Sequence, residues 1–167
     1  MYNTILSENL DENVFRLMSK DWMLLSAGKI NDFNNMTASW GGLGYLWNKP
    51  VAFIFVRPPR YTYNYIESND YFTINFFEEK YREILNLSGT KSGREIDKMK
   101  NLGLTPIESE NKSVYYSEAR LIMECKKIYF QDINPGNFLD NTIMNKYPQK
   151  DFHRMYVGEI TKVLLKA

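Results

Sequence analysis

Short apolar runs separated by polar or glycine-containing segments are the main pattern of the chain. Residues 51–56 (VAFIFV) form an unbroken apolar stretch rich in β-branched and aromatic side chains, which is typical of a buried strand. Residues 22–30 and 71–77 have a similar composition, and residues 154–165 form another strand-like run. Residues 113–129 alternate enough to predict one long strand or the two pieces of a hairpin. The pattern therefore predicts a chain built mainly from strands.

Helical spacing of apolar residues occurs in three places. Residues 11–19 and 61–68 each predict a short helix. Residues 78–102 predict a longer helix, in which charged positions separate the apolar ones. Gly103 follows this segment and suits a helix C-terminal cap.

The connecting segments and the order of the elements decide the expected fold class. Residues 31–35, 41–50 and 134–149 are rich in polar residues, Gly or Pro, and they are predicted to be loops, the last with room for one helical turn. Strands outnumber helices and do not alternate with them as repeated βαβ units, so a Rossmann sheet is not expected. We expect a single domain over residues 1–167, mainly β, with peripheral helices around a Greek-key barrel.

Composition narrows the environment and the partners of the chain. Its 167 residues are enough to bury a core, and 44% of them are apolar. With 21 basic and 20 acidic side chains the net charge is only +1, which does not favour nucleic-acid binding. No apolar run approaches the roughly 20 residues that span a membrane, and the first residues do not resemble a signal peptide. A single cysteine excludes an internal disulfide, so a cytoplasmic location is expected.

The segment 34–41 (NNMTASWG) is the first candidate for a binding site. Small and hydroxyl-bearing residues before a glycine pair let the backbone approach a ligand closely and offer N–H and hydroxyl donors. Trp40 adds an apolar wall, and the aromatic content of 15% would serve either a β-rich core or a stacking surface for a planar ligand. On composition alone, the segment fits a tight turn as well as a site.

Two arginines form the second candidate. Arg57 and Arg60 follow the strongest strand, and Pro58 stiffens the backbone between them. Guanidinium groups at this spacing can converge on one phosphate, and Thr62 could offer its hydroxyl or N–H to the same anion. A solvated loop with salt-bridged arginines is the alternative.

A Ser/Gly-rich stretch, residues 88–94, is the third candidate. If it leads into a helix, it offers backbone donors and a positive helix end, and Arg94 and Lys98 share one helix face. It does not match the P-loop pattern G-x-x-x-x-G-K-[ST], so a helix start with exposed charges is the alternative. The three candidates together describe a site for a planar ligand that carries a phosphate.

The remaining titratable residues argue against several enzyme classes. His153 is the only histidine and Cys125 the only cysteine, and they lie in distant segments, so neither a Ser-His-Asp triad nor a zinc site is expected. No metal site is predicted. Acidic residues such as Asp151 lie in polar stretches and are expected to be solvated, which leaves glycosidase chemistry unsupported.

In four ordered segments the chain resembles the flavin reductase-like family, whose members fold as FMN-binding split barrels. The segments are NNMTASWG, WNKPVAFIFVRPPRYTYNYI, FTINFF and SGTKSGREIDK. His153 follows them, with VGEI four residues later, and residues 108–147 match least. The resemblance implies a six-stranded antiparallel Greek-key split barrel and a homodimer with flavin near the subunit interface.

The resemblance also assigns residues to the flavin. It implies that the N-x-M-T-x-S-W segment lines the isoalloxazine ring and helps to hold the ribityl phosphate, and that R-P-x-R-Y-T flanks the phosphate and the pyrimidine side. The S-G-R-x-x-D-K element would contribute a lysine contact, and the histidine would lie near the ring. These roles carry over to Asn34, Asn35, Met36, Thr37, Ala38, Ser39, Trp40, Arg57, Pro58, Arg60, Tyr61, Thr62, Ser92, Gly93, Arg94, Asp97, Lys98 and His153.

The activity that the resemblance implies is electron transfer through bound FMN, as in an NAD(P)H-dependent flavin reductase or oxidoreductase. FMN is favoured over FAD because paired arginines suit a terminal phosphate. The alternative is a flavoredoxin-like electron carrier that exchanges electrons with a redox protein and has no nicotinamide site. A third possibility is a barrel that has lost flavin. The chain departs from the family at residues 87–90, where many members have a cysteine.

Overall fold

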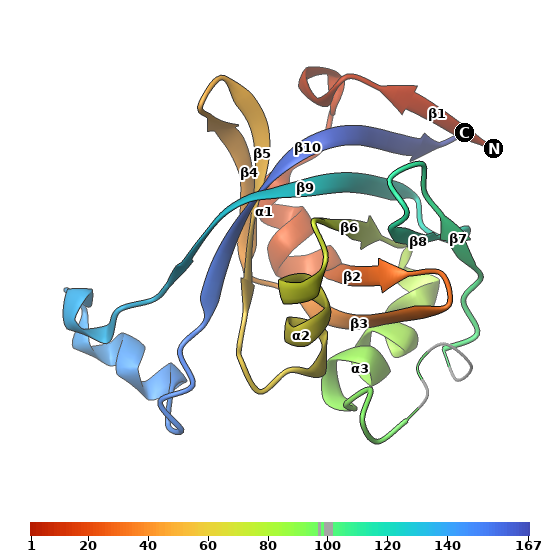
Figure 1. The fold of residues 1–167 in the computed structure, drawn as a ribbon. Helices are drawn as coiled ribbons and strands as arrows, with labels where there is room; N and C mark the ends of the chain where they lie inside the picture. The colour runs from red at the N-terminus through yellow and green to blue at the C-terminus, as the bar shows by residue number, and fades with distance from the viewer. Residues whose placement is uncertain (97, 99–101) are drawn as a thin grey trace.

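The computed structural model describes residues 1–96, 98 and 102–167. Its main sheet has eight strands, paired antiparallel in the order β3-β2-β6-β9-β10-β5-β4, with β1 beside β10 (Figure 1). These strands are β1 (Tyr2–Ile5), β2 (Met23–Lys29), β3 (Asp32–Ala38), β4 (Gly41–Leu46), β5 (Lys49–Val56), β6 (Tyr71–Phe76), β9 (Leu121–Asp132) and β10 (Arg154–Lys166). A second sheet pairs β7 (Pro106–Glu108) with β8 (Val114–Tyr116).

The sheet is curved but not closed, since β3 and β4 stand at the two ends of the strand order. The expected mainly β fold class, a split barrel of antiparallel strands, is confirmed. The sheet has eight strands where six were expected. One of the additional strands is β1. It pairs with the last residues of the long strand β10, whose first half pairs with β5.

Two apolar clusters hold the sheet. Leu25 and Phe72 belong to the larger cluster, and Leu24 and Phe33 belong to a second cluster that also contains Leu85 of the helix over residues 82–90. Successive side chains of a strand point to opposite faces, so β2 is buried on both sides. This explains why residues 22–30 form a continuous apolar run rather than an alternating one.

The helices of the described residues are short. They are α1 (Val14–Arg16), α2 (Tyr61–Ser68) and α3 (Arg82–Thr90), with single-turn elements η1 (Ser7–Asn9), η3 (Glu79–Tyr81), η4 (Pro135–Asn137) and η5 (Asn141–Lys146), and the π-helical turn η2 (Leu17–Asp21). Leu85 of α3 is buried in the second cluster, which places the helix beside β3. No helix of the described residues is long and apolar enough to cross a membrane.

Several element predictions were wrong. Residues 31–35 were expected to be a loop, yet β3 begins at Asp32, because polar Asn34 and Asn35 are satisfied by buried hydrogen bonds. Residues 41–50 were also expected to be a loop, but they form β4 and the start of β5, joined by a tight turn in which Trp47 and Asn48 have positive φ. Of the helix expected over 78–102, α3 ends at Thr90, and residues 97 and 99–101 lie outside the described residues.

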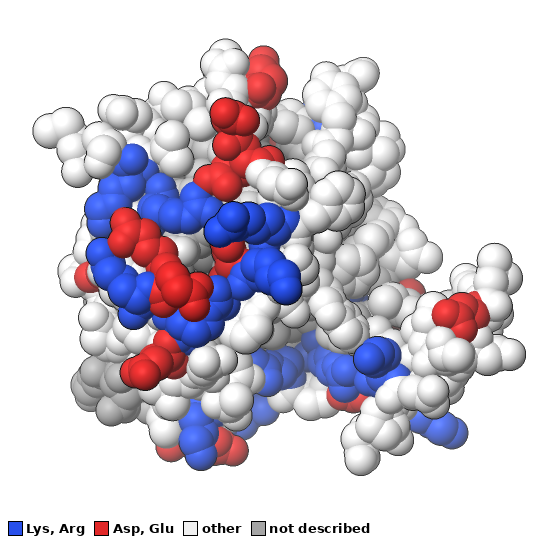
Figure 2. Space-filling view, turned by 180° about the vertical axis from the view of Figure 1, so that it is seen from behind, with Lys and Arg blue, Asp and Glu red and all other residues white. Residues whose placement is uncertain are grey.

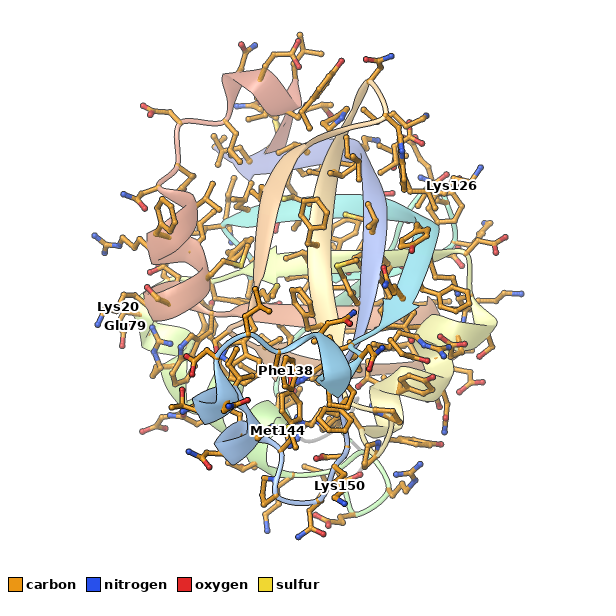
Figure 3. All side chains as sticks on the ribbon, turned by 90° about the vertical axis from the view of Figure 1, so that its left-hand side faces the viewer. Lys20, Glu79, Lys126, Phe138, Met144 and Lys150 are labelled. Atoms are coloured by element: carbon orange, nitrogen blue, oxygen red, sulfur yellow. The ribbon has the colours of Figure 1, made fainter. Side chains whose placement is uncertain are left out.

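A segment between β9 and β10 projects away from the sheet (Figure 1). It carries η4 and η5, and its surface is mostly uncharged in the reverse view of Figure 2. Figure 3 labels Phe138 and Met144 on this segment, in front of the sheet. The projection matters for the site because its C-terminal end, residues 147–153, returns to the sheet at the cavity described below.

Candidate functional site

A cavity of about 410 Å³ lies where β3 and β5 end and β10 begins, next to the C-terminal end of α3. Its volume lies within the range of small-molecule sites, about 300–1,000 Å³. Four separated stretches of the chain form its wall. The lining residues are Met36, Thr37, Ala38, Ser39, Trp40, Phe55, Arg57, Arg60, Gly89, Asp151 and His153.

The end of β3 forms one wall of this cavity. Because β3 stands at the end of the sheet, part of its backbone N–H and C=O groups have no neighbouring strand and can face a ligand. The Thr37 hydroxyl is not free, since it donates to the Leu85 carbonyl of α3 at 2.6 Å. Trp40 is 44% exposed and offers its indole as an apolar surface. The wall thus offers backbone groups and an aromatic face.

Arg57 enters the cavity already paired with protein groups. Its guanidinium donates to both carboxylate oxygens of Asp151, at 3.1 and 3.0 Å, and to the Lys146 carbonyl at 2.8 Å. It also lies over the Tyr147 ring, 5.0 Å from the centroid. The prediction that Asp151 is solvated was wrong, because its side chain is only 16% exposed and neutralises Arg57.

Arg60 reaches the same cavity but keeps its charge available. It donates to the Gly89 carbonyl at 3.0 Å, and no salt bridge to it occurs among the described residues. Burial lowers the pKa of Arg60 below its usual high value, and the neighbouring Arg57 lowers it further. An arginine with a moderately lowered pKa is still charged at neutral pH. The wall therefore carries two guanidinium groups and one carboxylate.

His153 packs against Trp40, with 5.1 Å between the ring centroids. Its Nδ1 lies 2.8 Å from the hydroxyl oxygen of Tyr147. Burial, and then the charge of Arg57, lower the pKa of His153 to about 4. The imidazole is therefore neutral at pH 7, and the cavity has an excess of one positive charge that suits an anionic ligand.

The remaining predicted site residues lie around this cavity rather than in its wall. Arg94 lies 4.8 Å over the Tyr61 ring and donates to the Pro59 carbonyl at 3.1 Å. Asn34 donates to the Thr62 hydroxyl at 2.8 Å. Tyr61, Asn34, Gly93, Arg94 and Lys98 line a neighbouring cleft of about 270 Å³.

Close packing, rather than ligand contact, explains the Gly93 position. A Cβ there would lie 2.3 Å from Asn34 Oδ1 and 2.9 Å from Tyr61 Cδ1, so only glycine fits. Ser92 accepts a hydrogen bond from the Arg94 backbone N–H, and Pro58 is exposed. Asp97 lies outside the described residues.

Two of the residues named here, Tyr147 and Phe55, were not singled out by the sequence. They have no motif signal of their own, and they lie at the site only because the projecting segment and β5 converge there. Gly89, from the Ser/Gly-rich candidate stretch, lies in the cavity wall. Among the residues that the structure describes, no cluster of three or more His, Cys, Asp or Glu side chains could hold a metal ion.

Comparisons with known proteins agree with the fold. The family model described as "Flavin reductase like domain" matches residues 15–167. No curated protein sequence matches the chain.

Among solved structures, the flavoredoxin of Methanosarcina acetivorans is 21% identical, with a TM-score of 0.69 over 97% of this chain and 76% of that chain. An FMN-binding domain of a flavin reductases-like enzyme from Shewanella baltica OS155 is 17% identical, with a TM-score of 0.72 over 99% and 77%. The flavoredoxin of Desulfovibrio vulgaris (Miyazaki F) is 23% identical, with a TM-score of 0.69 over 97% and 77%.

Proposed function

Because the chain belongs to the flavin reductase-like family, we propose that it binds FMN in the cavity beside Trp40 and acts as an oxidoreductase. The observation that supports this most directly is the meeting of Trp40, Arg57 and Arg60 on one cavity. An aromatic face suits the flat ring of a flavin, and arginines suit its phosphate. FMN-binding proteins among the structural neighbours agree with this proposal.

The residues present fit the FMN group. The cavity volume of about 410 Å³ is adequate for a small planar ligand, and the excess positive charge complements a phosphate. Arg60 is the principal phosphate anchor, since its guanidinium is not committed to a carboxylate among the described residues. FMN is preferred over FAD because the cation lies at the cavity wall, where a terminal phosphate can be bound directly.

Each wall of the cavity has its own part in binding. The edge backbone of β3 offers N–H groups to the polar rim of the ring, and Trp40 with His153 excludes water from one side of it. The neutral imidazole adds no charge that would compete with the arginines for the phosphate. Once bound, the flavin would supply the electron chemistry, and the protein binds, orients and shields it.

Titration of flavin-free protein with FMN and with riboflavin tests this assignment. Riboflavin has the same ring but no phosphate, so we expect it to bind at least tenfold more weakly than FMN, because charge-assisted hydrogen bonds to a phosphate are worth about 1.5–3 kcal/mol. Quenching of flavin fluorescence gives both dissociation constants. Failure of the protein to take up either flavin would overturn the proposal and favour a barrel that has lost flavin.

Two candidate functions differ in the electron donor that reduces the flavin. We propose an NAD(P)H-dependent flavin reductase, and the flavoredoxin neighbours keep a carrier that serves a redox protein as the second candidate. Anaerobic mixing of the yellow protein with NADH, and separately with NADPH, distinguishes them. Bleaching of the flavin absorbance within a turnover supports the reductase, whereas persistent colour supports the carrier.

We also propose that the chain forms a homodimer. The projecting segment exposes three large apolar side chains, of which Ile143 is 38% and Met144 36% exposed and the third is Leu139. Leu139 is fully exposed. Contiguous exposed apolar residues mark protein interfaces more often than free surface. A second copy is the partner that the family resemblance implies.

A further inference from the structure

A second cavity, of about 510 Å³, lies at the point where β10 changes its neighbouring strand. The pairing of β10 with β5 ends at Glu159, and its pairing with β1 begins at Val163. Between Ile160 and Lys162, β10 also shifts its register against β9. A β-bulge bends its strand, and bulges are common beside binding sites. The sheet therefore forks here, between β5 and β1, and we call the opening the fork cavity.

Two walls enclose the fork cavity. One is the edge strand β4, which contributes Leu43, Gly44 and Tyr45, and the other is formed by residues between 7 and 14, from η1 to the start of α1. In Figure 3 this red N-terminal segment runs along one side of the strands, and α1 contacts β4. Because β4 stands at the end of the strand order, part of its backbone N–H and C=O groups have no neighbouring strand.

Apolar side chains of the core form the floor of the fork cavity. Met123 and Val163 are buried members of the larger apolar cluster, and Leu10 and Leu43 pack against that cluster from the two walls. The volume exceeds the 410 Å³ of the cavity beside Trp40 and lies within the range of small-molecule sites, about 300–1,000 Å³. The floor thus offers an apolar surface that the body of a small ligand can cover.

The charged groups of the fork cavity are acidic. Glu8 and Glu12 line it, and no Lys, Arg or His side chain does so among the described residues. Glu12 is compensated, because it binds Arg120. Glu8 is exposed, and its carboxylate has only the Ser7 hydroxyl as a hydrogen-bond partner in the described part of the chain, at 3.4 Å. One negative charge of the cavity is therefore left without a cation.

An aromatic ring accompanies this charge. Tyr45 lines the fork cavity and is 72% exposed, so its ring is open to a ligand. The face of an aromatic ring attracts ammonium groups, and a carboxylate does so by its charge. The combination of an apolar floor, an aromatic ring and a free carboxylate is suited to an organic cation and disfavours an anion.

We propose that the fork cavity is a second binding site of this protein and that it takes an organic ammonium ion with an apolar body. The apolar body covers the floor at Met123 and Val163, and the ammonium lies at the rim, near Glu8 and Tyr45. The free carbonyl groups of β4 accept hydrogen bonds from its N–H groups.

This site is independent of the proposed FMN site. The two cavities share no lining residue. Pro50 of β5 lies in the fork cavity and Phe55 of the same strand lies in the cavity beside Trp40. Five residues of an extended strand span about 17 Å. A ligand of the fork cavity can therefore bind while FMN is in place.

Three probes of similar shape test the charge requirement, namely phenylpropylamine, phenylpropanol and phenylpropanoate. Each is titrated into isotope-labelled protein with FMN in excess, and backbone amide signals are followed by NMR. We expect the amine to shift the signals of Leu43 and Ile160 in a saturable way and to leave that of Trp40 unchanged. The alcohol should bind up to about fivefold more weakly, because an exposed ion pair contributes little, and the carboxylate should bind more weakly still.

Two pairs of variants locate the probe. Leu43→Trp should abolish binding of the amine by filling the cavity, whereas Leu46→Trp, on the opposite face of the same strand and outside the cavity, should retain it. Glu8→Gln should remove the difference between amine and alcohol, and Glu83→Gln, an exposed carboxylate of α3, should preserve it. An unchanged affinity of Leu43→Trp for FMN would show that the barrel is intact.

Several outcomes would overturn the proposal. They are the absence of saturable shifts, shifts confined to the cavity beside Trp40, a carboxylate probe that binds as tightly as the amine, and unchanged amine binding by Leu43→Trp. Absent shifts in a protein that is dimeric by light scattering would indicate that a second copy covers the cavity. None of these results bears on FMN binding, which is measured separately.

A measurement on the unsubstituted protein covers the case in which Leu43→Trp does not fold. Nuclear Overhauser contacts between the ring of phenylpropylamine and the methyl groups of Val163 should appear when the probe is bound. Their absence at saturation would contradict the assignment of the site.

Discussion

At the scale of single residues, two neighbouring arginines have acquired different roles. Arg57 is bound by Asp151 and the Lys146 carbonyl, so it anchors the returning segment, whereas Arg60 has only the Gly89 carbonyl among the described residues. The carboxylate of Asp151 also lies in the cavity wall, where it opposes an incoming phosphate. Asp151, which belongs to no motif recognised in the sequence, therefore lowers the positive charge that the cavity offers to a phosphate.

This arrangement predicts opposite effects of two substitutions on FMN affinity. Arg60→Ala should weaken binding by at least tenfold, because a charged hydrogen bond of about 1.5–3 kcal/mol is lost. Asp151→Asn should strengthen binding several-fold, because it frees Arg57 and removes a negative charge. Glu83→Gln, which changes an exposed carboxylate of α3, is the control and should have no effect. Equal affinities for all three variants would remove Arg60 and Asp151 from the site.

His153 makes a second residue-scale prediction, on stability. Its pKa is about 4 when folded and about 6.5 when unfolded, so the unfolded chain binds more protons between these values. The contribution of His153 to stability is therefore complete above pH 6.5 and is lost as the pH falls toward 4, by up to about 3 kcal/mol. Urea unfolding at several pH values should show a steeper loss for the unsubstituted protein than for His153→Gln. Parallel profiles would contradict the assignment.

At the scale of elements, β10 organises the sheet. It pairs with β9 along almost its whole length and changes its other partner from β5 to β1. The register with β9 shifts after Val157, next to Gly158. A Cβ at Gly158 would lie 2.5 Å from Phe72 Cζ and 2.9 Å from Cys125 Cβ. The strands can approach this closely only because residue 158 has no side chain.

Gly158→Ala should therefore destabilise the fold by about 1–3 kcal/mol, the usual cost of overpacking a core. Thermal unfolding compares it with Gly42→Ala, a strand glycine whose Cβ would find its nearest neighbour at 4.0 Å and cause no clash. We expect Gly42→Ala to be neutral or slightly stabilising. If the two variants melt alike, the close contact with Phe72 does not limit this position.

At the scale of the whole molecule, the projecting segment is the feature that a single copy leaves unexplained. It is fixed at its base, where Arg154 binds Asp132 through two hydrogen bonds, at 2.6 and 2.8 Å, and lies 4.5 Å over the Phe130 ring. The segment bears the fully exposed Leu139. An exposed apolar side chain on an anchored segment is suited to contact a second molecule.

The proposed dimer predicts a mass of twice the chain mass of 19.7 kDa by light scattering. Replacing both Leu139 and Ile143 by Asp should shift the protein toward the monomer, since charges at an apolar interface are not paired. Phe15→Asp is the matched control, because Phe15 is 86% exposed on α1, away from the projection. An unsubstituted protein that is monomeric, or a double variant that remains dimeric, would contradict the role of this segment.

The sequence by itself determined the mainly β class, the buried strands β2, β5, β6 and β10, and the segments that meet at the cavity. Apolar periodicity and β-branched composition are local properties, so they can be recognised without the fold. Tertiary structure decided the rest. Residues 41–46 became a strand because β5 pairs with them. Asp151 became buried because Arg57 compensates its charge. Lys98 became buried because the Asn35 carbonyl of β3 and the Ser88 carbonyl of α3 accept hydrogen bonds from its ammonium. Partners far apart in the sequence leave no local pattern, and only the folded chain brings them together.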